Sequence, residues 1–118
     1  MYVVDGSCLT IGDGCMLSDY IDIRTTDNHA IFDRNAKNRI NFESDIILHP
    51  NVWVGTRSII LKGTEIAEGC IVGAGSVVTH QHYTPHAIIA GNPARIAKEN
   101  ITWTMPRLRE WDDSHCYG

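Results

Sequence analysis

The chain has 118 residues, a formal net charge of −4 and 43% hydrophobic residues, which suits one domain with a continuous narrow core. Its lysines and arginines are scattered and form no basic stripe, so we expect no nucleic-acid partner. No apolar run is long enough to span a bilayer, and the cysteines lack CxxC spacing, so we expect reduced thiols in a cytoplasmic protein.

The first predicted element is a coil of short strands, marked by aliphatic residues at intervals of six. Ile11, Leu17 and Ile23 follow this spacing. A period of two indicates a strand and a period near 3.6 a helix, whereas six fits a short strand plus a corner, repeated. We therefore expect one aliphatic side chain to point inward on each side of the coil.

The coil is interrupted after this first tract. The interval from Ile23 to Leu48 is not a multiple of six, so residues 29–41 are predicted to leave the coil as a loop before Phe42 resumes it. Charged and amide residues dominate this stretch, which is typical of a solvated, irregular segment. Because long loops inside compact repeats are often functional, this loop is a candidate for part of a site.

The second tract carries the strongest pattern in the sequence. The inward aliphatic positions are Leu48, Val54, Ile60, Ile66, Val72 and Val78. Four residues after each of the first five, a mostly small side chain is expected to fill a corner: Val52, Ser58, Thr64, Cys70 and Ser76. The residue before each of these is often glycine or asparagine, which tolerate the positive φ of a tight corner. Such repeats stack, so that each coil covers its neighbour.

Beyond Val78 the pattern changes to a turn-rich segment. We expect the coil to occupy residues 1–79, interrupted by the loop, and residues 80–118 to cap the same domain. Short helices are predicted at residues 94–100 and 106–112, the second with proline at its first position.

Four short segments occur in a fixed order along the six-residue repeats, which we call hexads, and these segments carry a family resemblance. They are Thr26-Asp27-Asn28-His29, Val52-Trp53-Val54-Gly55, Val72 to Thr79, and Ala90-Gly91-Asn92-Pro93-Ala94. Together with the hexads, they resemble the hexapeptide-repeat acyltransferases, particularly the sugar and polysaccharide O-acetyltransferases. This resemblance implies an all-β, left-handed parallel β-helix, an exception to the usual right-handed crossover. It also implies a homotrimer with acetyl-CoA held between adjacent prisms, and no metal.

The resemblance implies that His29 is the general base. A neutral imidazole near pH 7 is suited to taking the proton of a sugar hydroxyl, whose oxygen then attacks the thioester directly. Asp27 and Asn28 are assigned to holding the acceptor or orienting the imidazole, and Trp53 to positioning the acetyl group or the acceptor. Without the motif, a histidine at a coil-to-loop junction and a tryptophan at a subunit contact would be the simpler interpretations.

A second set of residues is implied to bind acetyl-CoA. Its members are Gly55, Thr56, Ala74, Thr79, Arg95 and Lys98. Thr56 and Ala74 are three hexads apart, so they should stack on neighbouring coils, which is a check independent of the resemblance. Arg95 and Lys98 are expected on one face of the predicted helix, where they would grip the phosphates, although a solvated helix face is the commoner role for such a pair.

Two alternatives accompany this interpretation. A non-catalytic trimeric β-helix, used for binding or structure, would keep the same motifs. A zinc-dependent carbonic anhydrase-like protein is the weaker alternative, raised by the cluster of His80, His82 and His86. That family's pattern places an isolated histidine one coil before a close pair on the prism wall, whereas these three follow the last hexad, so surface histidines are favoured.

The start of the chain bears on the acceptor site. In the sugar acetyltransferases that the chain resembles, part of this site comes from coils well upstream of the catalytic histidine, and those coils are not in this sequence. We therefore expect one of three cases: a minimal enzyme with an open acceptor site, a fragment of a longer protein, or a chain that keeps the CoA groove without efficient turnover. The identity of the acceptor is not readable from the sequence.

Overall fold

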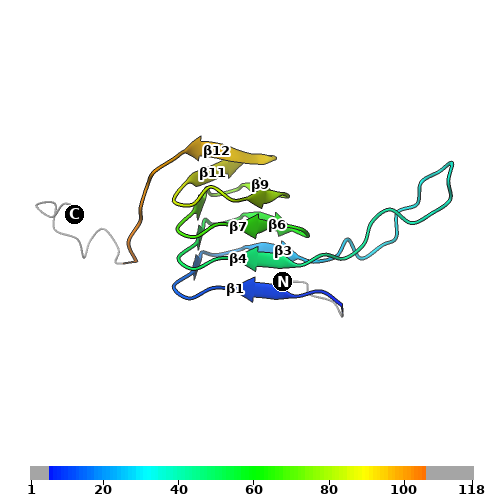
Figure 1. Cartoon of the computed structure of the whole chain (residues 1–118), viewed down its shortest axis with the longest axis horizontal. Helices are drawn as coiled ribbons and strands as arrows, with labels where there is room; N and C mark the ends of the chain where they lie inside the picture. The colour runs from blue at the N-terminus through cyan, green and yellow to red at the C-terminus, as the bar shows by residue number, and fades with distance from the viewer. Residues whose placement is uncertain (1–5, 106–118) are drawn as a thin grey trace, which may run out of the picture.

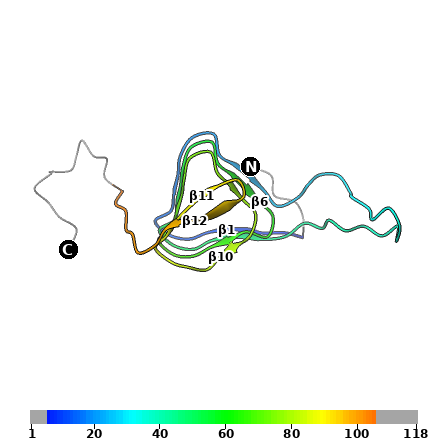
Figure 2. The same cartoon turned by 90° about the horizontal axis from the view of Figure 1, so that it is seen from above.

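A computed structural model describes residues 6–105, in which every regular element is a β-strand. Three sheets form the faces of a stack of coils (Figure 1), and the outline seen along the stack is triangular (Figure 2). The chain winds as a left-handed parallel β-helix, so the predicted fold class is confirmed. Within the described range, no helix is long and apolar enough to cross a membrane.

Successive strands occupy successive faces, so each of the first eight strands pairs in parallel with the strand three further on. The first face contains β1 (Leu9–Ile11), β4 (Ile46–Leu48), β7 (Glu65–Ile66) and β10 (Gln81–His82). The second contains β2 (Met16–Leu17), β5 (Trp53–Val54), β8 (Ile71–Val72), β11 (Ile88–Gly91) and β12 (Ala94–Lys98). The third contains β3 (Asp22–Arg24), β6 (Ile59–Leu61) and β9 (Val77–Val78).

The core is the predicted aliphatic ladder. All six inward positions of the second tract are fully buried: Leu48, Val54, Ile60, Ile66, Val72 and Val78. The corner side chains from Val52 to Ser76 are also buried, and positive φ angles occur at every predicted corner, including +61° at Asn51 and +80° at Gly63. Buried hydroxyls bond to backbone carbonyls, as when Thr64 Oγ1 donates to Val78 O at 3.1 Å. The hexad prediction is therefore confirmed in detail.

The first coil keeps this register but is less buried. Ile11 pairs with Leu48 and Leu17 with Val54, yet the two side chains remain 40% and 39% exposed. Ile23, the third member of the tract, is 2% exposed. Ile11 and Leu17 stay accessible because no described coil lies beneath the first one.

The predicted loop projects from one corner of the prism, between β3 and β4 (Figures 1 and 2). Its two arms meet at an antiparallel bridge between Phe32 and Arg39. The prediction that Phe42 resumes the coil is wrong, because this side chain is 58% exposed and lies under the Arg39 guanidinium at 4.9 Å. Coil pairing restarts where Ser44 N donates to Thr25 O at 3.0 Å, and Ile46 is the first fully buried aliphatic residue after the loop.

The C-terminal end of the stack differs from the prediction. The coil does not stop at residue 79, since β10 pairs with β7 and β11 with β8 in parallel. The predicted helix at residues 94–100 is wrong: Ala94–Lys98 is strand β12, antiparallel to β11. A strand satisfies the open edge of the last coil, whose backbone groups a helix would leave unpaired. The helix predicted at residues 106–112 lies outside the described residues.

Candidate active site

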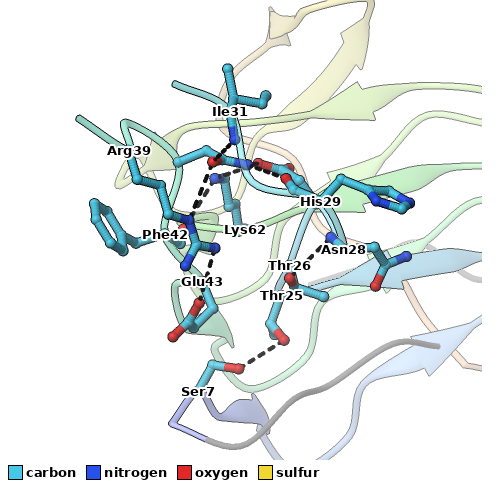
Figure 3. A network of polar contacts seen from close by, with 12 residues as sticks. Ser7, Thr25, Thr26, Asn28, His29, Ile31, Arg39, Phe42, Glu43 and Lys62 are labelled. Carbon is cyan, nitrogen blue, oxygen red and sulfur yellow. Dashed lines mark hydrogen bonds and ion pairs between the residues drawn. The ribbon is translucent and has the colours of Figure 1, made fainter. Parts of the chain in front are cut away.

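His29 begins the projecting loop, five residues after β3 ends at Arg24. The residue is exposed, and its imidazole is turned away from Arg39 and Lys62 (Figure 3). Its carbonyl oxygen accepts a hydrogen bond from Asn41 Nδ2 at 2.8 Å, so the backbone is anchored at this point. Within residues 6–105 no hydrogen bond to the ring itself is found. The ring is therefore available to an incoming hydroxyl.

Asp27 and Asn28 shape the chain that leads to His29. Asp27 Oδ2 accepts from Lys62 Nζ at 2.7 Å and from Asn41 Nδ2 at 2.9 Å. These hydrogen bonds, that from Lys62 first, hold the pKa of Asp27 below its ordinary value despite slight burial. Asn28 has a φ of +68°, and its N–H donates to Thr26 Oγ1 at 3.1 Å. The ionised Asp27 carboxylate is thus engaged at the base of the loop rather than with the imidazole.

Trp53 lies on β5 and points outward, as predicted, because its neighbour Val54 points into the core. Its indole Nε1 donates to Ser18 Oγ at 3.3 Å on the preceding coil. Trp103 packs beside it, with ring centroids 5.8 Å apart at an interplanar angle of 46°. Trp103 is itself fixed because its Nε1 donates to Asn51 O at 2.8 Å. Sequence reasoning missed Trp103, whose only signal was a tryptophan in a segment without hexads.

Gly55, Thr56 and Ala74 line one edge of the prism. Gly55 N donates to Val72 O at 2.8 Å, and Gly75 N donates to Thr56 O at 2.9 Å, so the two coils are directly stacked here. Thr56 and Ala74 therefore lie on neighbouring coils, as their interval predicts. Both residues are exposed, and neither backbone N–H donates a hydrogen bond to any described residue. These amides can serve an extended ligand that runs along the edge.

The other residues assigned to the cofactor are spread over the C-terminal coils. Thr79 follows β9 on the third face, and its hydroxyl hydrogen-bonds to His80 Nδ1. Arg95 and Lys98 are exposed on β12 of the second face, where Arg95 is opposite Ala90. The argument that both lie on one helix face is wrong because the segment is a strand. The structure does not bring Thr79 onto the face that carries Arg95 and Lys98.

The histidines that raised a zinc alternative do not form a ligand set. No group of three or more His, Cys, Asp or Glu residues suited to a metal ion occurs within the part of the chain that the structure describes. His82 is instead opposite Ile66 on the first face, at an inward position of the last coil. Its Nε2 is buried, with no hydrogen-bond partner among residues 6–105. Burial, followed by the nearby charges of His80 and Arg95, lowers the pKa of His82.

This burial of His82 predicts a pH-dependent stability. The pKa of His82 in the folded protein lies below the ordinary histidine value of about 6.5, so the unfolded chain binds the proton more readily. The contribution of neutral His82 to the free energy of unfolding is fully present when the pH is above the unfolded pKa. It is lost as the pH falls from the unfolded pKa towards the lower folded pKa. We expect the melting temperature to decrease as the pH falls from about 7.5 through the ordinary histidine pKa of about 6.5, and to decrease less in His82→Gln. Equal pH dependence in the two proteins, measured by circular dichroism, would contradict the assignment to His82.

The two halves of the candidate site lie on different parts of one chain. His29 belongs to the loop that leaves the prism after the third face, whereas Trp53 belongs to the second face. The loop and the segment that follows β12 extend from different corners (Figure 2). A single copy of the chain thus does not bring His29 and Trp53 together.

Known proteins contain the same kind of repeat and a similar fold. Residues 45–80 match the family described as "Bacterial transferase hexapeptide (six repeats)". A polysialic acid O-acetyltransferase of Escherichia coli O1:K1 / APEC is 40% identical over 116 residues, which is 97% of this chain and 38% of the relative.

Two solved structures are also similar. The polysialic acid O-acetyltransferase OatWY has a TM-score of 0.81 and 39% identity, covering 84% of this chain and 47% of that one. A galactoside acetyltransferase in complex with coenzyme A has a TM-score of 0.68 and 28% identity, covering 81% and 47%. The chain thus spans less than half the length of each of these proteins.

Proposed function

The chain belongs to the hexapeptide-repeat family of bacterial transferases, and on that premise we propose that it transfers an acetyl group from acetyl-CoA to a hydroxyl of a sugar or polysaccharide. The similar polysialic acid and galactoside enzymes are acetyltransferases, and the galactoside enzyme has been solved with coenzyme A. The observation that carries the proposal is the exposed His29, whose ring has no hydrogen bond within the described residues and whose backbone is anchored.

We assign His29 the role of general base. Its neutral imidazole takes the proton of the acceptor hydroxyl as the oxygen attacks the thioester carbonyl, and a tetrahedral oxyanion forms. Preorganised N–H donors stabilise this charge. Collapse breaks the carbon–sulfur bond, and the imidazolium returns its proton to the departing thiolate. The acetyl ester and free CoA are the products, so no acyl-enzyme is required.

The proposed binding of acetyl-CoA follows the prism edge. The free amides of Thr56 and Ala74 suit the pantetheine arm, and the outward Trp53 suits the thioester end. Gly55 lets the two coils approach closely at this edge. Arg95 and Lys98, both exposed on β12, remain proposed contacts for the phosphates, with Thr79 as a further contact.

We further propose that the protein is a homotrimer whose sites lie between copies. The separation of His29 and Trp53 within one chain supports this assembly, because a neighbouring copy could supply the missing half. A stable monomer in sedimentation velocity at micromolar concentration would contradict it. We also propose a cytoplasmic location, supported by the free thiols of Cys8, Cys15 and Cys70 among the described residues.

Tryptophan fluorescence tests the cofactor assignment. Acetyl-CoA placed beside Trp53 should change the emission of the Trp53–Trp103 pair in a saturable titration. We expect Trp53→Phe to lose most of this change. Release of free thiol with a panel of sugars then measures turnover. If millimolar acetyl-CoA neither alters the emission nor releases heat in calorimetry, the proposed function is wrong.

A further inference from the structure

Asn41 is a buried amide at the base of the projecting loop. The residue is 7% exposed. Its Oδ1 accepts the Ile31 N–H at 2.5 Å and lies 3.5 Å from Arg39 Nε. Its Nδ2 donates to His29 O at 2.8 Å and to Asp27 Oδ2 at 2.9 Å. Both the Oδ1 and the Nδ2 of Asn41 therefore have hydrogen-bond partners, and the three shortest of these hydrogen bonds are to residues 27–31.

These contacts imitate the pairing of a strand. The carbonyl of His29 and the N–H of Ile31 flank residue 30, and a single residue of a neighbouring parallel strand would engage both of them through its own N–H and C=O. The chain has already left the sheet at this point, because β3 ends at Arg24. The side chain of Asn41 thus replaces the missing strand partner across the loop. It fixes the backbone on both sides of residue 30 without touching the His29 ring.

Lys62 ties this arrangement to the prism. Its Nζ donates to Asp27 Oδ2 at 2.7 Å and to Phe42 O at 3.0 Å, so it holds both arms of the loop where they meet the stack (Figure 3). Lys62 directly precedes the corner at Gly63, whose φ of +80° belongs to the rigid coil. A continuous set of contacts therefore runs from the coil through Lys62, Asp27 and Asn41 to the backbone of His29.

We propose that Asn41 is a positioning residue, which holds the backbone at His29 so that the imidazole faces the acceptor hydroxyl. The inference rests on the proposed function. A base displaced by about 1 Å typically costs on the order of 10²-fold in rate, because the attack geometry is lost. Asn41 acts through His29 and makes no contact with the substrate.

Asn41→Ala and Asn41→Asp test this role, with Asn38→Ala as a matched control on the same loop. We expect both Asn41 variants to lower kcat by about 10- to 100-fold while the KM for acetyl-CoA stays within about twofold. Aspartate keeps an acceptor for the Ile31 N–H but cannot donate to His29 O, so it should not rescue turnover. Asn38→Ala, whose side chain makes no hydrogen bond within the described residues, should resemble the wild type.

Amide hydrogen exchange provides a readout that needs no activity. Exchange at the Ile31 N–H should be faster by about tenfold or more in Asn41→Ala than in the wild type, and unchanged in Asn38→Ala. Unaltered kcat, or parallel losses of kcat, acetyl-CoA affinity and melting temperature, would overturn the positioning role. If the wild type transfers no acetyl group although exchange at Ile31 responds, the proposed function fails and the contact is structural only.

Discussion

Replacing His29 with alanine is expected to lower kcat for acetyl transfer by about 10²- to 10⁴-fold, the usual contribution of a positioned general base. The affinity for acetyl-CoA should change little, because the cofactor is assigned to the edge formed by Thr56 and Ala74. Stability should also be nearly unchanged, since the exposed ring makes no hydrogen bond within the described residues. Steady-state kinetics with calorimetric binding of acetyl-CoA separates these effects.

His49 supplies the matched control for this substitution. Its Nε2 is 2.8 Å from Glu65 Oε2 on the wall of the prism, away from the loop that carries His29. His49→Ala should therefore retain most of the turnover. If His29→Ala transfers acetyl groups as fast as the wild type, direct transfer with His29 as base is wrong. If both variants lose activity together, the loss reflects the fold rather than the base.

Gly55→Ala is expected to lower the free energy of unfolding by about 1–3 kcal/mol, the usual cost of overpacking. A Cβ at Gly55 would lie 2.7 Å from both Ala74 N and Val72 O. These are backbone atoms of the next coil, so the two coils must separate rather than a side chain rotate. The separation occurs at the edge assigned to the cofactor, so acetyl-CoA binding should weaken as well. Urea denaturation and fluorescence titration measure the two losses.

Gly75→Ala distinguishes crowding from backbone strain. A Cβ there meets nothing within 4 Å, but the φ of +72° is unfavourable for alanine. This variant should lose about 1–2 kcal/mol of stability through strain alone and leave the spacing of the coils unchanged. Wild-type stability and cofactor affinity in Gly55→Ala would show that the coils tolerate the methyl group, and would remove the packing role assigned to Gly55.

The regular part of the fold could be predicted because one period governs it. Each inward residue from Leu48 to Val78 repeats the same local geometry, so spacing alone located the core and the positive-φ corners. The ends could not be predicted in this way. The sequence Ala94–Lys98 has good helix formers, but the open edge of β11 pairs with it as a strand, and this tertiary demand overrides local propensity.

The candidate site was predictable only in part. His29 and Trp53 were identified through the resemblance, and the outward direction of Trp53 followed from the register. The sequence predicts Asn41 only as the last residue of an irregular loop, although its side chain is buried in the structure. Its contacts with Asp27, and those of Lys62, join segments far apart in the sequence. The six-residue spacing contains no information about such contacts, because they depend on where the second arm of the loop meets the first arm and the coil.

The insertion of the loop between β3 and β4 also sets how freely its length can vary. Partners in the first two coils are 37 residues apart, as in Leu9 and Ile46, whereas partners in the second and third coils are 18 apart, as in Ile47 and Glu65. Roughly doubling a closed loop adds only about 0.6 kcal/mol of closure entropy. That is less than a typical single hydrogen bond contributes, about 1 kcal/mol. The prism therefore sets almost no thermodynamic limit on the length of the segment that contains His29, so under the proposed function this length is free to differ between enzymes with different acceptors.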